Sequence, residues 1–234
     1  MKLKGLLKNI MNITYKTFSE KGPRNENQDY IRVMSDAENG RHTFILCDGM
    51  GGHALGGFAA KIVATSMARH LHDKKSGEQD ILSATGQASW TLDTMSEVYN
   101  NAMMGATMVL AQLEGDRLTV AHCGDSRVYV FSKDKELKYR TKDHTIEGDL
   151  ESLLTRGFFT GHPGKALPET ETMEVKSGDR ILLCSDGMWS SMNPEILRDR
   201  MMDDKPLEEI MDTFKFMCEK FSQDNYSAIL IDIE

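Results

Sequence analysis

The sequence predicts one domain of the α+β class, and three observations support this prediction. A chain of 234 residues fits a single hydrophobic core, because such cores stop growing only near about 250–300 residues. Strand-like and helix-like segments come in blocks, without the strict alternation of a parallel sheet. No repeat, low-complexity stretch or Pro/Gly/Ser-rich linker divides the chain. We expect the domain at 13–234, after a lead-in at 1–12 that is either a short amphipathic segment or dispensable residues before a start at Met11.

Extended segments are predicted where alternating or continuously apolar runs end at turn residues. The run at 43–47 is mostly apolar, as expected of a strand that is buried on both faces. Gly22-Pro23 and Asn39-Gly40 are turn signals that separate the first segments. On these grounds we predict strands at 13–19, 30–34, 43–47, 107–113, 118–122, 127–131, 136–141, 172–175, 181–184 and 226–233.

Two long helices are predicted between the third and fourth strands. The first follows His53 and repeats apolar residues on one face at helical spacing. The second is expected at 78–103, with Gly77 between the two helices and Gly86 weakening the second. The apolar face of the first helix consists of Phe58, Ala59, Ile62, Val63 and Met67.

The C-terminal half predicts shorter helices among strands. A short helix is expected at 147–156, followed by an irregular segment at 158–165. Pro194 and Pro206 are typical first residues of two further helices, because proline fits the first helical position. The apolar face of the last helix consists of Leu207, Ile210, Met211, Phe214, Cys218 and Phe221.

Charge and hydropathy argue against two kinds of partner. The chain has 28 Lys and Arg against 36 Asp and Glu, a formal net charge of −8. An acidic surface repels nucleic acid, and no basic stripe with interleaved aromatic residues offsets it. The mean hydropathy is −0.43, and no apolar run approaches the roughly 18 residues of a membrane span. We expect no nucleic-acid partner and no membrane insertion, and the excess acid belongs either to a cation-binding cleft or to solvated faces.

The four cysteines, Cys47, Cys123, Cys184 and Cys218, include no C-x-x-C pair. Three of them end or punctuate apolar strand-like runs, where cysteine behaves as a small hydrophobic residue. We therefore expect free core thiols in a reducing compartment, which predicts a cytoplasmic protein. The lack of paired spacing disfavours a zinc site built from them.

One feature occurs twice, in that a buried strand runs directly into an Asp-Gly pair. These pairs are Asp48-Gly49 and Asp186-Gly187. The strand end mounts the carboxylate rigidly, and the glycine permits a tight turn with an approachable backbone carbonyl. Hard divalent cations such as Mg²⁺ and Mn²⁺ prefer such oxygen ligands.

Three more aspartates, Asp29, Asp125 and Asp224, flank predicted strands. Taken singly, each is typical of a turn or a helix cap. If all five carboxylates converged in one cleft they would require cations, because several unscreened carboxylates cannot all stay ionised together.

Short motifs around these aspartates follow one another between residues 22 and 231, and jointly they are highly specific. They are Arg24-Asn25-Glu26-Asn27-Gln28-Asp29, Asp48-Gly49-Met50-Gly51-Gly52-His53, Gly105-Ala106-Thr107, Gly124-Asp125-Ser126-Arg127, Lys142-Asp143-His144, Ser185-Asp186-Gly187 and Asp224-Asn225. In these residues the chain resembles the metal-dependent Ser/Thr protein phosphatases, the protein phosphatase 2C family, in its compact bacterial form. The first two motifs are similar to the family patterns R-x-x-N-[EQ]-D and D-G-M-G-G-H.

The resemblance implies a four-layer α-β-β-α sandwich, two antiparallel sheets flanked by helices, with two Mn²⁺ or Mg²⁺ ions at one end. It implies that Asp48 bridges both ions and that Asp186 and Asp224 hold the first. The Gly49 carbonyl would contribute to the second, which Asp29 would reach through water. Asp125, with Asp186, would form a weaker third site.

The resemblance also assigns residues to the substrate. Arg24 would bind the phosphate, and a guanidinium has the planar fork for two of its oxygens. His53 is the nearest candidate for the general acid, with a structural or solvent-facing histidine as the alternative. Two metals lower the pKa of a water, so that no Ser or Cys nucleophile is needed.

Two departures from the family pattern stand out. Gly56-Gly57 replaces a more polar helix start without removing a ligand. The segment 145–168 is compressed where relatives carry a longer flap, which affects the expectations for substrate choice and the third metal.

The leading functional prediction is a metal-dependent phosphatase of Ser/Thr phosphoproteins, acting as a cytoplasmic monomer. The alternative is a catalytically weak regulatory or phosphoprotein-binding module of the same fold, which loss of the metal carboxylates would favour. A phosphatase specialised for one switch protein differs from the leading prediction only in its substrate.

Overall fold

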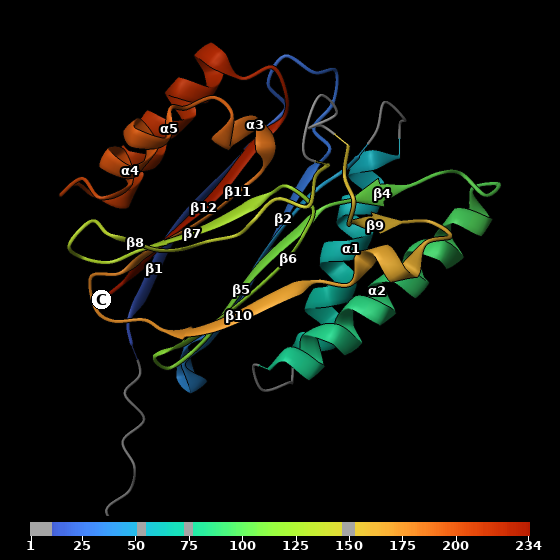
Figure 1. Cartoon of the computed structure of the whole chain (residues 1–234), viewed down its shortest axis with the longest axis horizontal. Coiled ribbons are helices and arrows are strands. Elements are labelled where there is room, and N and C mark those ends of the chain that lie inside the picture. Colours follow the sequence, from blue (N-terminus) through green and yellow to red (C-terminus); the bar gives the residue numbers. More distant parts are fainter. Residues whose placement is uncertain (1–10, 51–54, 73–76, 147–152) are drawn as a thin grey trace, which may run out of the picture.

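Two antiparallel sheets packed face to face form the centre of the computed structural model, which describes residues 11–50, 55–72, 77–146 and 153–234 (Figure 1). The first sheet consists, in spatial order, of β1 (Ile13–Glu20), β12 (Tyr226–Ile233), β11 (Arg180–Cys184), β7 (Arg127–Phe131) and β8 (Leu137–Arg140). The second consists of β10 (Glu169–Glu174), β6 (Arg117–Cys123), β5 (Met108–Glu114), β3 (Arg41–Asp48) and β2 (Asp29–Asp36).

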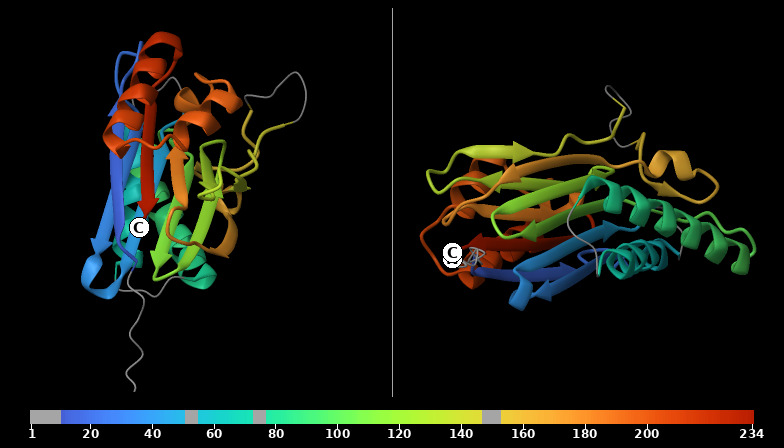
Figure 2. Two further views of the ribbon diagram at one scale, coloured as in Figure 1. Left: turned by 90° about the vertical axis from the view of Figure 1, so that its left-hand side faces the viewer. Right: turned by 90° about the horizontal axis from the view of Figure 1, so that it is seen from below.

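Helices cover the outer face of each sheet, which gives four layers (Figure 2). The second sheet packs against α1 (Gly56–Leu71) and α2 (Glu78–Val98). The first sheet packs against α3 (Asp186–Trp189), α4 (Pro194–Met201) and α5 (Leu207–Phe221). The predicted α+β class and the α-β-β-α sandwich are confirmed.

The continuously apolar strands are those that are buried on both faces. In β3, Phe44 and Leu46 lie between the two sheets, while Ile45 and Cys47 face α1 and α2. Successive side chains of a strand point to opposite faces, so a strand between two cores needs apolar residues at every position. The same reasoning explains the continuously apolar sequence of β11. All four cysteines are buried free thiols, as predicted.

Two helix predictions are wrong in their extent. The second helix ends at Val98 rather than at 103, because Asn100 and Asn101 adopt φ of 57°, outside the range of a right-handed helix. Residues 147–152 lie outside the described residues, but 153–156 are not helical, since Leu154 forms an isolated bridge with Thr145. The conformation of residues 153–156 is therefore set by pairing with a distant segment rather than by the local helical periodicity of the sequence.

The remaining departures are small. The segment expected to be irregular contains β9 (Phe158–Phe159), which pairs with β4 (Gly105–Ala106), and a short 3-10 helix, η2 (Pro163–Ala166). A second 3-10 helix, η1 (Ala37–Asn39), joins β2 to β3. Pro194 is the first residue of α4 as predicted, whereas Pro206 precedes the first residue of α5. Among the described residues, no helix is both long enough and apolar enough to cross a lipid bilayer.

Candidate metal centre

The topology brings the predicted carboxylates to one end of the sandwich, near α3 and the start of α1 (Figure 1). Asp29 begins β2 and Asp48 ends β3, and the two residues are direct partners in the antiparallel register. Asp125 lies in the turn between β6 and β7, and Asp224 precedes β12. Asp186 begins α3 and is separated from β11 only by Ser185, so each carboxylate lies at or near the end of a strand.

Burial and neighbouring carboxylate charges raise the pKa values of Asp29, Asp48, Asp125 and Asp186. Burial raises the pKa of Asp29 to about 6, with the charges of Asp186 and Asp224 adding to it against hydrogen bonds from two serines. Burial, and then the charge of Asp186, raises the pKa of Asp125 to about 7.

The pKa of Asp48 shifts in the same direction. Burial raises its pKa well above the usual range, and the charges of Asp29, Asp186 and Asp125 raise it further. The interaction between the Asp48 and Asp186 carboxyls further raises the pKa of Asp48 and lowers that of Asp186, which favours a proton on Asp48. Without counter-cations, the centre therefore holds protons at pH values where isolated carboxylates are ionised.

Two oxygen atoms of this centre have no hydrogen-bond partner. Asp29 Oδ1 and Asp186 Oδ1 are buried, and no described residue donates to either. A buried carboxylate oxygen without a donor is costly unless a cation approaches it. The oxygen-only donor set and these unpaired atoms fit hard divalent cations such as Mg²⁺ or Mn²⁺.

Polar residues to which the sequence analysis assigned no role hold Asp29 in place. The Ser185 hydroxyl donates to Asp29 Oδ2 at 2.7 Å and accepts the Ser227 N–H at 3.0 Å. Asn225 Oδ1 accepts the Gln28 N–H at 2.9 Å, just before Asp29. Its Nδ2 donates to the carbonyls of Lys21 and Glu26, so Asn225 fixes the loop that carries Arg24. The only signal for Ser185 and Asn225 in the sequence is their place beside Asp186 and Asp224.

Thr107 joins Asp48 to the turn that carries Asp125. Its N–H donates to the Asp48 carbonyl at 2.8 Å, and its Oγ1 accepts the Asp48 N–H at 3.1 Å. The same Oγ1 lies 2.8 Å from the Ser126 hydroxyl. Gly124 has φ of +118°, and a Cβ there would lie 2.7 Å from Thr107, so the turn requires glycine.

Gly49 is packed too closely to accept a side chain. A Cβ on Gly49 would lie 2.2 Å from the Gly56 carbonyl oxygen and 2.8 Å from that of Gln28. A Cβ on Gly56 would in turn lie 2.9 Å from the Gly49 carbonyl oxygen. Glycine at position 56, which looked like a weak helix start, is therefore required where α1 meets the centre.

Arg24 is exposed at the edge of the centre. Its Nη2 donates to Asp224 Oδ2 at 2.7 Å, and its Nε donates to the Gln223 carbonyl at 3.2 Å. The structure therefore brings Arg24 together with the carboxylates, in an ion pair with one of the predicted ligands. His53, the proposed general acid, lies outside the described residues.

A second group of ligand-type side chains, His122, His144 and Glu169, lies beside the Asp125 turn. His144 Nδ1 accepts the Gly124 N–H at 3.2 Å, so in the neutral ring the proton is on Nε2, which lies 3.3 Å from Glu169. His122 Nε2 donates to the Lys142 carbonyl at 2.9 Å. A protonated Nε2 cannot ligate a metal, so His144 supports the Gly124 turn in this arrangement.

Comparisons with known proteins agree with this geometry. The family model described as "Protein phosphatase 2C" matches residues 23–233. The serine/threonine protein phosphatase PstP of Mycobacterium tuberculosis is 28% identical over 250 residues, which cover 94% of this chain and 45% of that protein. The serine/threonine phosphatase stp of Listeria monocytogenes is 26% identical over 238 residues, covering 89% of this chain and 91% of that protein.

A solved structure agrees as well. The catalytic domain of PstP, crystallised in complex with two manganese ions, has a TM-score of 0.81 and 25% identity, and covers 95% of this chain and 99% of that one. The fold and the aspartate centre define a phosphatase-type sandwich with an acidic site at one end. This chain belongs to the protein phosphatase 2C family. It spans about half the length of PstP and most of the length of the Listeria protein.

Proposed function

We propose that this chain is a metal-dependent phosphatase that hydrolyses phosphoserine and phosphothreonine in proteins. The observation that carries the proposal is the buried aspartate centre, in which Asp29 Oδ1 and Asp186 Oδ1 have no described hydrogen-bond donor. The family membership and the two manganese ions of the related PstP structure support the same activity.

The same residues would hold two Mn²⁺ or Mg²⁺ ions, with Asp48 between them. Asp186 and Asp224 would serve one ion, and the Gly49 carbonyl and Asp29 the other, while Asp125 with Asp186 would hold a weaker third. Bound divalent ions supply a water of lowered pKa and offset the charge of the phosphate. The strand ends keep the ligands fixed, so little reorganisation is needed during the reaction.

Arg24 would bind the substrate phosphate. When Asp224 serves as a ligand, the guanidinium loses that partner, and its planar fork is then available to two phosphate oxygens. His53 as general acid to the leaving serine or threonine oxygen stays a prediction. The proposed substrates are cytoplasmic phosphoproteins, and we expect the chain to act as a monomer.

The alternative is a catalytically weak regulatory or phosphoprotein-binding module of the same fold. Loss of the ligand carboxylates would favour this alternative, but Asp48, Asp186 and Asp224 are all present. Their shared position at the ends of strands favours the active enzyme.

Turnover of a small aryl phosphate tests the proposal directly. We expect activity with Mn²⁺ or Mg²⁺ that is lost in EDTA and restored by adding the metal. Asp48→Asn should lower kcat at least about a thousandfold, the scale of removing a principal catalytic element. Asp134→Asn, on an exposed turn, is the matched control and should retain wild-type kcat. Full activity in the chelated protein, or in folded Asp48→Asn, would contradict the proposal.

A further inference from the structure

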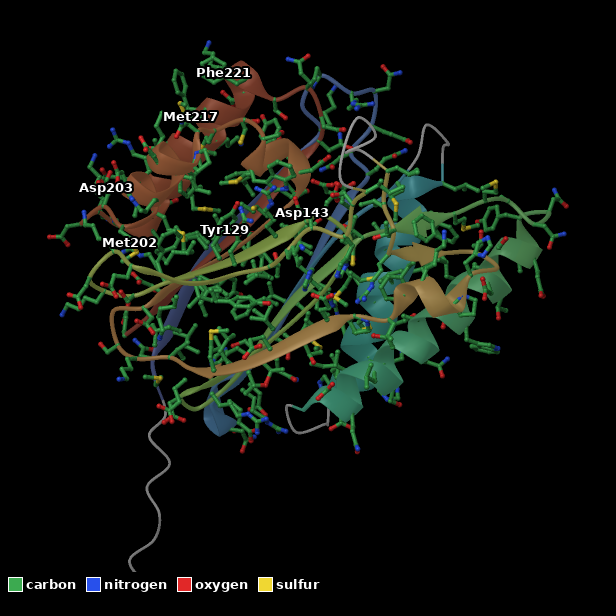
Figure 3. All side chains as sticks on the ribbon, viewed as in Figure 1. Tyr129, Asp143, Met202, Asp203, Met217 and Phe221 are labelled. Carbon is green, nitrogen blue, oxygen red and sulfur yellow. The ribbon has the colours of Figure 1, made fainter. Side chains whose placement is uncertain are left out.

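A polar cavity of about 360 Å³ lies beside the aspartate centre. It is bordered by the segment after β8, by residues 155 and 156, and by the first residue of β10. Figure 3 shows Asp143, from this segment, below α3. The charged residues that line the cavity are Arg140, Lys142, Asp143, Arg156 and Glu169.

The acidic residues of this cavity are already paired. Asp143 accepts two hydrogen bonds from Arg127, at 2.8 and 2.6 Å. Glu169 Oε1 lies 3.2 Å from Arg156 and 3.3 Å from His144. Both carboxylates therefore have cationic or N–H partners before any ligand arrives.

Arg140 supplies the positive charge that remains after these pairings. Arg140 is exposed and forms no ion pair with any other described residue. Lys142, which is also exposed, lines the same rim. In a chain whose net charge is −8, this positive cavity fits an oxyanion, and a guanidinium can bind one with two parallel hydrogen bonds.

The cavity is within reach of a peptide held at the aspartate centre. His144 lines the cavity and contacts Gly124 at 3.2 Å, and Asp125 is the next residue. An extended peptide advances about 3.3–3.6 Å per residue. Two to four residues of an extended peptide span roughly 7–14 Å.

We propose that the cavity bordered by Arg140, Lys142 and Arg156 binds an acidic side chain of the substrate, two to four residues from the phosphorylated one. The inference rests on the proposed phosphatase function and names its substrate class, phosphoproteins with acidic residues near the target site. The group bound in the cavity would be a carboxylate of the substrate peptide rather than a free phosphate ion.

The test uses phosphothreonine peptides that carry Glu, Ala or Lys at positions two to four on either side. Both kcat/KM and binding, by fluorescence anisotropy, are measured for wild type, Arg140→Glu and Arg117→Glu. Arg117 is the matched control, because it is an exposed arginine at the far end of β6. Hydrolysis of an aryl phosphate, which lacks flanking residues, reports the aspartate centre alone.

We expect wild type and Arg117→Glu to prefer one Glu peptide over its Ala counterpart by about five- to tenfold. Arg140→Glu should lose this preference and favour Lys, with aryl phosphate turnover within about twofold of wild type. High salt should reduce the preference, because exposed charges are screened.

Equal kcat/KM and equal binding of the Glu and Ala peptides by wild type would overturn the inference. So would an Arg140→Glu protein whose only change is weaker inhibition by inorganic phosphate, since the cavity would then hold the free ion. If wild type hydrolyses no substrate yet binds the Glu peptide through Arg140, the phosphatase function fails and the acidic-peptide site stands.

Discussion

Arg24 is predicted from the sequence to bind phosphate, and the structure pairs it with Asp224 at 2.7 Å. The side chains of Arg24 and Asp224 are 57% and 38% exposed. Exposed ion pairs contribute at most about 1 kcal/mol, so this pair can be exchanged for a phosphate at little cost. The same guanidinium can therefore neutralise Asp224 in the empty centre and bind substrate in the loaded one.

Substitutions of Arg24 test this exchange at the scale of one residue. Arg24→Ala should raise KM for a phosphopeptide about tenfold, and any extra contact in the transition state would also lower kcat. Arg24→Lys keeps the charge but loses the fork, so it should recover only part of kcat/KM. Steady-state kinetics give kcat and KM for both variants. The metal affinity, measured by calorimetric titration, should change little, because Arg24 is not among the proposed ligands. If kcat/KM of Arg24→Ala stays within about twofold of wild type, below about 0.5 kcal/mol, the phosphate lies elsewhere.

At the scale of elements, the junction of β3 with α1 depends on two glycines in contact. Gly49→Ala places a Cβ 2.2 Å from the Gly56 carbonyl oxygen, so the backbone must shift, and we expect a loss of roughly 2–4 kcal/mol of unfolding free energy. Gly86→Ala is the control, because nothing lies within 4 Å of its Cβ in the exposed middle of α2. It should stabilise the protein by about 0.5–1 kcal/mol. Urea unfolding compares the two, and equal midpoints would refute the role of the close contact.

The elements also show which features the sequence could predict. Continuously apolar runs predicted β3 and β11, because a strand between two cores leaves no position for a polar residue. The helical segment expected at 147–156 is wrong where it is described, since the pairing of Leu154 with Thr145 joins two strands through space. The roles of Thr107 and Asn225 were likewise missed, because each binds partners far away in the chain.

At the scale of the whole molecule, the fold buries like charges at one end of the sandwich. Burial and neighbouring charges raise the pKa values of Asp29 and Asp125 to about 6 and about 7, and they raise that of Asp48 well above its usual range. The ionised centre therefore opposes folding until cations enter it, and metal binding by the native state alone stabilises the protein by mass action. Stability and metal loading are linked through these carboxylates.

Asp125 gives this linkage a sign that can be measured in the chelated protein. Its pKa is about 7 in the folded chain, against the ordinary 3.8 when unfolded. Between these values the native state binds more protons than the unfolded state, so stability from this group is present below about pH 4 and lost as the pH rises through 7. In EDTA, the free energy of unfolding of Asp125→Asn should therefore rise relative to that of wild type by up to about 4 kcal/mol between pH 4 and pH 8, at about 1.4 kcal/mol per pKa unit. Thermal unfolding of both proteins across this range cancels the contributions of all shared groups. Parallel pH profiles would show that Asp125 is not raised in pKa, and saturating Mn²⁺ at pH 8 should instead favour the wild type.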